Sequence, residues 1–314
     1  MVSLNGANTF DSVVVHTEEV MSRLAVLILL RSCCASMLTQ SPSGSRTVAH
    51  LESMRVRPYF EALKTATVED RRLLLRRDIS RETLAERPLI PEEDVPVLID
   101  LLNGSDPDLA ASAASHLIVM AARNWGALGE VRPSIARALP AMARHFDGPN
   151  PPIVNGESVR PDIWRLNVMQ FVWLLGTPPP ASLVEKLLLA LRADETATDA
   201  TRALVQLKPV PSEVIEAILA KITQVRVREK GLMIDALVTG GVRTEPFVHA
   251  LAAILDNPGE RHQDAALALL HLGAAAKTAE PALRRFVSKE ATFGTDDWTS
   301  QNMARQALKD LGSK

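Results

Sequence analysis

Apolar residues recur along most of this chain with the spacing of one face of a helix. Between positions 213 and 222 adjacent apolar residues recur every three to four positions. A near copy of this pattern returns between 247 and 255. Such spacing is typical of amphipathic helices that bury a single face. The residues concerned are Val214, Ile215, Ile218, Leu219 and Ile222, then Phe247, Val248, Leu251, Ile254 and Leu255.

A short motif repeats and sets a period. Ala-Leu pairs stand at 203/204, 236/237, 268/269 and 307/308, three of them within the form Ala-x-x-Ala-Leu-x-x-Leu, and the steps between them are 33, 32 and 39 residues. Self-similarity at such a period predicts an array of helix pairs, in which each pair hides its apolar face against the next.

Turn residues divide the array into helices. Asp106 is placed to cap a helix that begins at Pro107 and runs through Ala121, after a first helix over 95–102. An aspartate cap followed by proline is favoured because proline's missing N–H is not needed at that position. Similar signals are expected to cap later helices at Ser212 and Thr244 and to end helices at Gly240 and Gly273.

The Ala-Leu helix endings and the Asp-Pro-Asp turn at 106–108 resemble those of HEAT-repeat proteins. The resemblance implies an all-α fold: an α-solenoid of stacked antiparallel helix pairs, an armadillo-type superhelix, over residues 91–314. The chain departs from the family pattern where Leu109-Ala110 and Arg261-His262 replace the usual Val-Arg, so the family's ladder of Asp and Arg is incomplete here.

The region before the array is less regular. Residues 1–45 are predicted to form a leader, and residues 46–90 a helical cap. Within the leader, 21–36 combines a short basic start, the apolar run 24–30 and small residues, as an export signal does, although Arg31 interrupts it. Export follows if translation starts at Met21. Otherwise the segment is a disordered leader with a short helix docked on the array, and the protein is cytoplasmic.

Composition excludes several classes of protein. The chain has 35 basic and 37 acidic residues, so no nucleic-acid partner is expected from its net charge of −2. No apolar run reaches the length of a transmembrane segment. The two cysteines, Cys33 and Cys34, are adjacent and have no third partner, which leaves neither a disulfide framework nor a thiolate zinc site within one chain.

Motifs for catalysis or for binding of a cofactor or metal are not found, and we predict none of these sites. The densest group of possible ligands is His262, Asp264 and His271, but the two histidines are nine residues apart and do not share a helix face. The arginines between 71 and 77 fit a solvated helix face as well as a phosphate or acidic partner.

Two insertions break the period, at 147–161 and 288–297. Insertions in repeat arrays emerge as loops at one edge and often carry specificity. Arg160, Trp164 and Trp298 lie in or beside them, and tryptophan and arginine dominate binding hot spots. These three residues are therefore the predicted contacts with a partner, although burial in a core is the simpler role for Trp164, and the same two roles are open to Trp298.

The sequence favours a non-catalytic scaffold that binds a protein or peptide on an extended helical-repeat surface. The alternative is an enzyme on the same kind of scaffold, for which DNA glycosylases and bilin lyases with HEAT-like repeats provide precedents. The slightly acidic balance and the absence of a pigment-handling signature argue against both.

Overall fold

The structure, a computed structural model, describes residues 65–67, 94–128, 133–148, 163–257, 260, 262–289 and 296–312. The leader, the export-like segment 21–36, nearly all of the predicted cap, Arg160 and the centres of both insertions lie outside these ranges. All regular elements within them are helices, and the described residues contain no strand. The all-α part of the prediction is confirmed.

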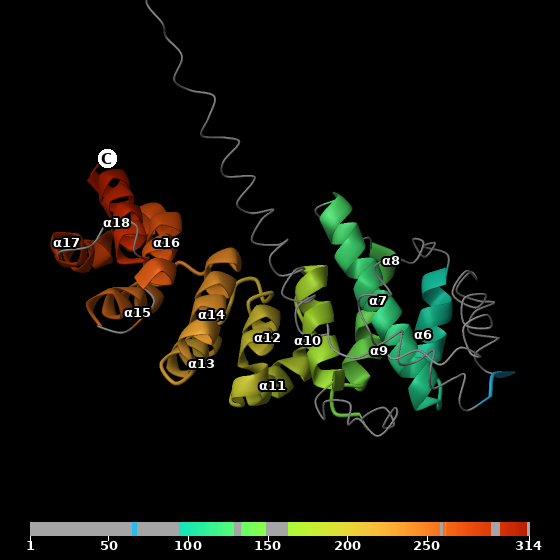
Figure 1. Ribbon diagram of the computed structural model, residues 1–314. Coiled ribbons are helices and arrows are strands. Elements are labelled where there is room, and N and C mark those ends of the chain that lie inside the picture. Colours follow the sequence, from blue (N-terminus) through green and yellow to red (C-terminus); the bar gives the residue numbers. More distant parts are fainter. Residues whose placement is uncertain are drawn as a thin grey trace, which may run out of the picture. The chain divides into compact units, whose positions relative to one another are not determined.

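The chain divides into two compact units, and most of their described helices are labelled in Figure 1. The first unit comprises residues 1–120 with 151–158, and the second comprises 121–150 with 159–314. The proposed boundaries at 45 and 90 fall outside the described ranges and stay a prediction.

The first unit contains α6 (Val95–Asn103) and the start of α7 (Pro107–Leu128). The Asp106 carboxylate accepts a hydrogen bond from the Leu109 amide at 3.2 Å, and Pro107 is the first residue of the helix. The predicted cap is thus confirmed, although α7 runs seven residues past the predicted end at Ala121. The early part of α7 is rich in small buried residues, namely Ala110, Ala111, Ser112, Ala113 and Ala114.

The second unit is a succession of short helices. After α8 (Pro133–Ala136) and α9 (Leu139–Arg144), the chain forms helices that are mostly 9 to 13 residues long. They are α10 (Ile163–Leu175), α11 (Ala181–Ala190), α12 (Asp194–Leu204), α13 (Ser212–Ile222), α14 (Val227–Thr239), α15 (Glu245–Asp256), α16 (His262–Leu272), η2 (Gly273–Ala279), α17 (Glu280–Ser288) and α18 (Asp296–Gly312).

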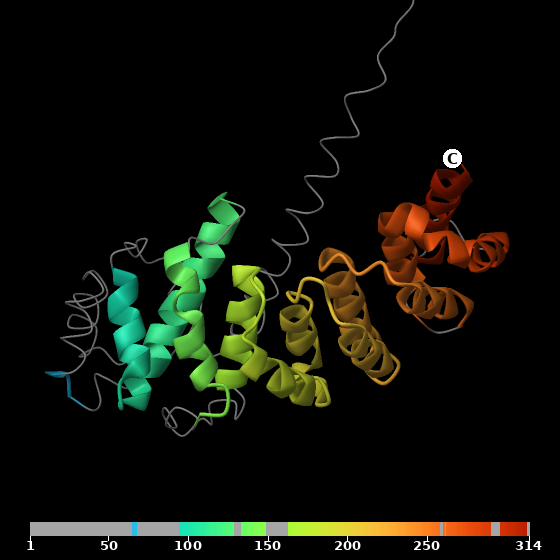
Figure 2. The ribbon, with the colours of Figure 1, turned by 180° about the vertical axis from the view of Figure 1, so that it is seen from behind.

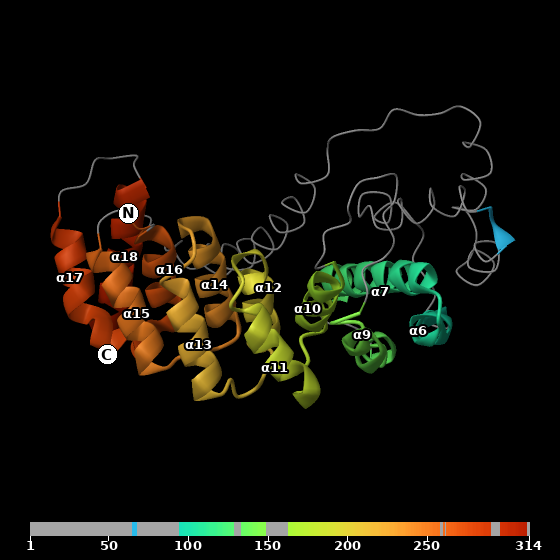
Figure 3. The same cartoon turned by 90° about the horizontal axis from the view of Figure 1, so that it is seen from below.

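These helices pack in two rows, which are best separated in the view from below (Figure 3). In the even row, α10, α12, α14, α16 and α18 each contact the next. The odd row consists of α11, α13, α15 and α17, and each of its helices packs on the even helix that follows it in the chain. Consecutive helices therefore form hairpins that cross between the rows.

The repeated motif is the core of the even row. Ala203 and Leu204 on α12, and Leu237 and Leu269 at the matching places on α14 and α16, are completely buried. The small alanine lets neighbouring even-row helices approach each other. The leucine beside it fills the space between one hairpin and the next. In the last copy, on α18, Ala307 is buried but Leu308 is half-buried.

The structure confirms some of the predicted helix ends and contradicts one of them. Ser212 is the first residue of α13 rather than its cap, because Pro211 takes that position, so this prediction is wrong. Thr244 does occupy the cap position of α15, but its hydroxyl is buried without a hydrogen-bond partner. Gly240 and Gly273 follow the last residues of α14 and α16, as predicted. Gly273 has φ +53°, a conformation that glycine adopts without strain.

Candidate interaction sites

The side chains of 145–147 and 164–165, on either side of the first insertion, form a cluster in the second unit, which we call the foot of the insertion. The imidazole of His145 stacks on the indole of Trp164, with ring centroids 4.4 Å apart and 18° between the planes. Next to this stack, the Arg165 guanidinium lies 5.9 Å from the centre of the Phe146 ring. Residues on both sides of positions 149–162 are therefore held together by their side chains.

Ion pairs also join residues of this foot to each other and to α11. The Asp147 carboxylate lies 2.6 Å from the Lys186 ammonium and 3.6 Å from the Arg165 guanidinium. These side chains are about half exposed, so solvent screens the attraction and each pair contributes well under about 1 kcal/mol. Lys186 belongs to α11, so the cluster also ties the foot of the insertion to the next hairpin.

Trp164 anchors the insertion from the interior. Its side chain is only 2% exposed, which leaves almost no surface for a partner to contact directly. Trp298, the other predicted tryptophan, is half-buried on the first turn of α18. Near it, the buried Gln301 amide donates to the carbonyls of Phe286 and Lys289, at 3.1 Å and 2.8 Å. Those two bonds fix the end of α17 where the second insertion begins.

A second cluster, on the even row, was not anticipated as a site. The Arg202 guanidinium of α12 lies 4.9 Å from the centre of the Trp173 indole of α10. Asp199, one turn before Arg202, lies 3.8 Å from it at the limit of an ion pair. The Trp173 side chain is half-buried and that of Arg202 is 14% exposed, so both reach the surface.

Similar half-buried residues continue along the even row, whose helices follow one another in Figures 1 and 2. On α12, the residues that are not buried are 194, 195, 198, 199 and 202, and the last four form a single stripe at helical spacing. The matching stripes on the other helices combine apolar and charged side chains. The even-row stripe comprises Leu166, Trp173, Asp199, Arg202, Leu232, Asp235, Leu267 and Leu270.

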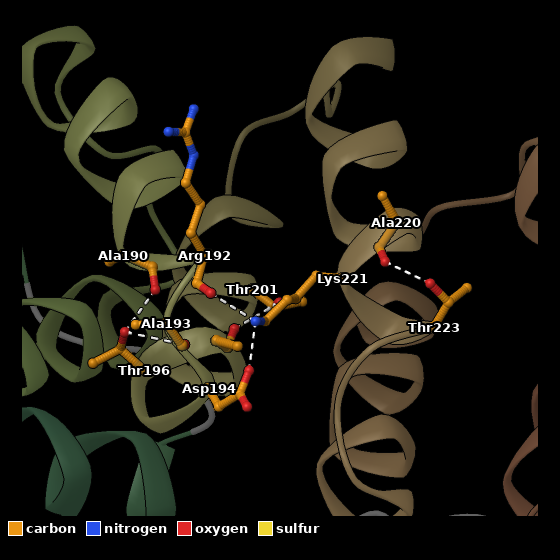
Figure 4. Close-up of polar contacts among 10 residues, drawn as sticks. Ala190, Arg192, Ala193, Asp194, Thr196, Thr201, Ala220, Lys221 and Thr223 are labelled. Atoms are coloured by element: carbon orange, nitrogen blue, oxygen red, sulfur yellow. Dashed lines mark hydrogen bonds and ion pairs between the residues drawn. The ribbon is translucent and has the colours of Figure 1, made fainter.

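A third cluster joins two hairpins around Lys221 (Figure 4). The Lys221 ammonium, at the end of α13, donates to the Arg192 carbonyl at 2.6 Å and pairs with the Asp194 carboxylate at 2.5 Å. In the same turn, the buried Thr196 hydroxyl donates to the Ala190 carbonyl at 2.6 Å. Lysine near the end of a helix satisfies carbonyls that would otherwise lack partners. Here the lysine comes from the next hairpin.

Two further ion pairs link later hairpins. The Lys230 ammonium lies 2.6 Å from the Glu260 carboxylate, and both side chains are largely buried. Arg285 on α17 forms two hydrogen bonds with Asp256 at the end of α15, at 3.2 Å and 2.6 Å. The Arg285 hydrogen bond lowers the pKa of the Asp256 carboxyl, partial burial opposes this, and the charges of Arg285 and Lys289 add to the lowering.

Of the histidines considered as metal ligands, His262 makes other contacts. The His262 ring shares a hydrogen bond with the Asn257 carbonyl at 3.1 Å and packs against Phe286, with centroids 4.9 Å apart. His271 is exposed at the end of α16. Within the described ranges, no three His, Cys, Asp or Glu side chains are grouped as a metal ion would require.

Sequence reasoning did not find the Trp173–Arg202 pair. Trp173 is not among the predicted contact residues, and Arg202 is the variable third residue of a repeated Ala-x-x-Ala-Leu motif. The two are 29 residues apart, close to one period, and that distance is the signal that could have linked them. Residues one period apart in an array of stacked repeats occupy matching positions on neighbouring helices.

Comparison with known proteins adds no relative. No protein-family model matches the chain, and no curated protein is similar enough to count as related. None of the helices in the described ranges combines the length and apolar character required to cross a bilayer.

Proposed function

We propose that the second unit is a HEAT-like α-solenoid and that it serves as a non-catalytic scaffold for a protein or peptide partner. The alternating contacts of the two rows support the solenoid, because each hairpin contacts its neighbours along the chain. The repeated burial of Ala-Leu at matching positions supports a HEAT-like unit as its basis.

The even-row stripe is the observation that carries the functional part of the proposal. It mixes half-buried leucines and a tryptophan with charges of both signs. A stripe of this kind suits a protein surface better than the phosphate backbone of a nucleic acid, which requires a cationic face. Trp173 and Arg202 are the strongest candidates within it, because these residue types dominate hot spots.

The repeat architecture can be tested by removing one period. Deletion of residues 205–237 removes 33 residues and joins Leu204 to Val238, which restores the sequence that follows the Ala-Leu pair at 236/237. A solenoid tolerates this deletion, so we expect a soluble helical protein with one cooperative unfolding transition. Deletion of residues 205–229 is the control, because it breaks the period. Loss of folding in the first variant but not in the second would contradict the solenoid.

Binding can be tested by affinity purification from cells that naturally contain the protein. The W173A/R202A double variant is compared with R284A, which removes an exposed arginine of an i,i+4 ion pair on the odd row. We expect specific partners to fall at least about tenfold in the double variant and to remain in R284A. Equal recovery from both variants, with helicity retained in circular dichroism, would exclude the stripe as the binding surface.

A further inference from the structure

The junctions between neighbouring hairpins are not built alike in the odd row. The helices α13 and α15 pack against each other, and so do α15 and α17. In contrast, the backbones of α11 and α13 make little or no close contact, although α12 and α14 of the same two hairpins are packed together. The view from below shows α11 and α13 next to each other at the matching place in the odd row (Figure 3).

One side chain crosses this junction. The Lys221 side chain is 8% exposed, and its ammonium reaches the turn between α11 and α12, where it meets the Arg192 carbonyl and the Asp194 carboxylate (Figure 4). Asp194 itself is 71% exposed. Because the ammonium is held at the edge of the interior beside an exposed carboxylate, water can replace both partners once the lysine stem swings outward.

The opposite side of the same junction is rigid. A Cβ atom added to Gly240, at the end of α14, would lie only 2.6 Å from the Cβ atom of Val205, at the end of α12. The backbones therefore approach as closely as glycine allows. Close packing of this kind leaves little room for translation and favours rotation about the line of contact.

We propose that the α11–α13 junction is a hinge and that Lys221 is its latch. The α12–α14 contact is the pivot, and the odd-row side opens when the Lys221 ammonium leaves Arg192 and Asp194. The α15–α17 junction does not open in this way, because its helices pack directly on each other and the Arg285–Asp256 pair only adds to that contact. The proposal concerns motion within the second unit and does not depend on a partner.

Hydrogen exchange followed by mass spectrometry tests the latch on the intact chain. The K221M variant keeps the apolar stem and loses the ammonium. We expect amide exchange in the turn 191–196 to rise about tenfold, as loss of a charge-assisted hydrogen bond implies. Exchange in α16, two hairpins away, should not change. A rise of similar size in both places would indicate general destabilisation and would overturn the hinge.

The R285M variant is the matched control. It removes the corresponding odd-row ion pair at a junction where the helices are packed, so exchange in 245–256 should change less than about twofold. An equal rise at both junctions would overturn the proposal, as would an unchanged turn 191–196 in K221M. If K221M does not fold, D194N carries the test: its exposed side chain can be altered without disturbing the core, and it should raise exchange in the same turn.

Discussion

The even and odd rows of the second unit are joined by different means. Even-row neighbours meet through alanines, buried leucines and two glycines, Gly231 and Gly240, which leave room for the Asp264 carboxylate and for Val205 on the adjacent helices. Odd-row helices also bury large side chains, such as Phe247 and Phe286, and ion pairs of long side chains, those of Lys221 and Arg285, cross two of their junctions. The even row is thus held mainly by apolar packing at these points, whereas the odd row combines apolar packing with ion pairs that solvent reaches.

The largest expected effect comes from a leucine of the motif. Leu237 on α14 is completely buried, whereas Leu189 on α11 is 61% exposed. Leu237→Ala should lower the free energy of unfolding by about 2–5 kcal/mol, since it removes buried methyl groups and leaves a cavity. Leu189→Ala should change the same quantity by less than about 0.5 kcal/mol. Urea unfolding of both variants checks the contrast, and equal effects would contradict it.

A smaller effect is expected at the pivot between α12 and α14. Gly240→Ala places a methyl group 2.6 Å from the Cβ atom of Val205, which is anchored to the backbone and has little freedom to move. The variant should lose about 1–3 kcal/mol of unfolding free energy through overpacking. Reducing the neighbour in the double variant V205A/G240A should recover part of the loss. Thermal unfolding that shows no loss in G240A would disprove the close approach.

Gly231 in α14 should respond more mildly. A Cβ atom there would lie within 3 Å of the Asp264 carboxylate, the mobile end of a side chain on α16. Gly231→Ala should therefore change stability by less than about 1 kcal/mol, because the helix gains from alanine while the carboxylate has to move. In a D264A background that obstacle is absent, and the same change should stabilise by up to about 1 kcal/mol. Denaturant titration of the four proteins measures both values.

The smallest expected effect is the pH dependence of the Asp256–Arg285 pair. The pKa of Asp256 is lowered in the folded state, so its contribution is present above the unfolded pKa of about 3.9 and is lost as the pH falls through the folded value. Both side chains are well exposed, so Asp256→Asn should lower the melting temperature at pH 7 by about 1 °C or less.

The difference between D256N and the unmodified protein should vanish at acid pH, below both pKa values of Asp256. A difference that grows on acidification would show that the pair does not act as its geometry indicates. The same comparison in high salt should also reduce the difference, because the pair is accessible to ions.

Local patterns identified the helices with good success. The stripes at 213–222 and 247–255 and the Asp106 cap all correspond to helices or helix starts in the structure. The Ser212 prediction failed because a cap is recognised in a sequence by residue type alone. In the structure Pro211 takes the cap position, one residue earlier. The prediction for Trp164 could not be decided from its neighbours, since burial depends on what the tertiary structure places over an indole. His145 stacks on that ring.

By itself, the sequence determined the helical class, the period and the apolar faces, because these depend on neighbours within a few turns of the chain. Only the tertiary structure decided that Trp173 meets Arg202, that Lys221 reaches back to Asp194, and that two glycines of the even row leave room for side chains of the neighbouring helices. Each of these contacts joins residues about one repeat apart, and helical periodicity carries no information on which side chains bridge that distance.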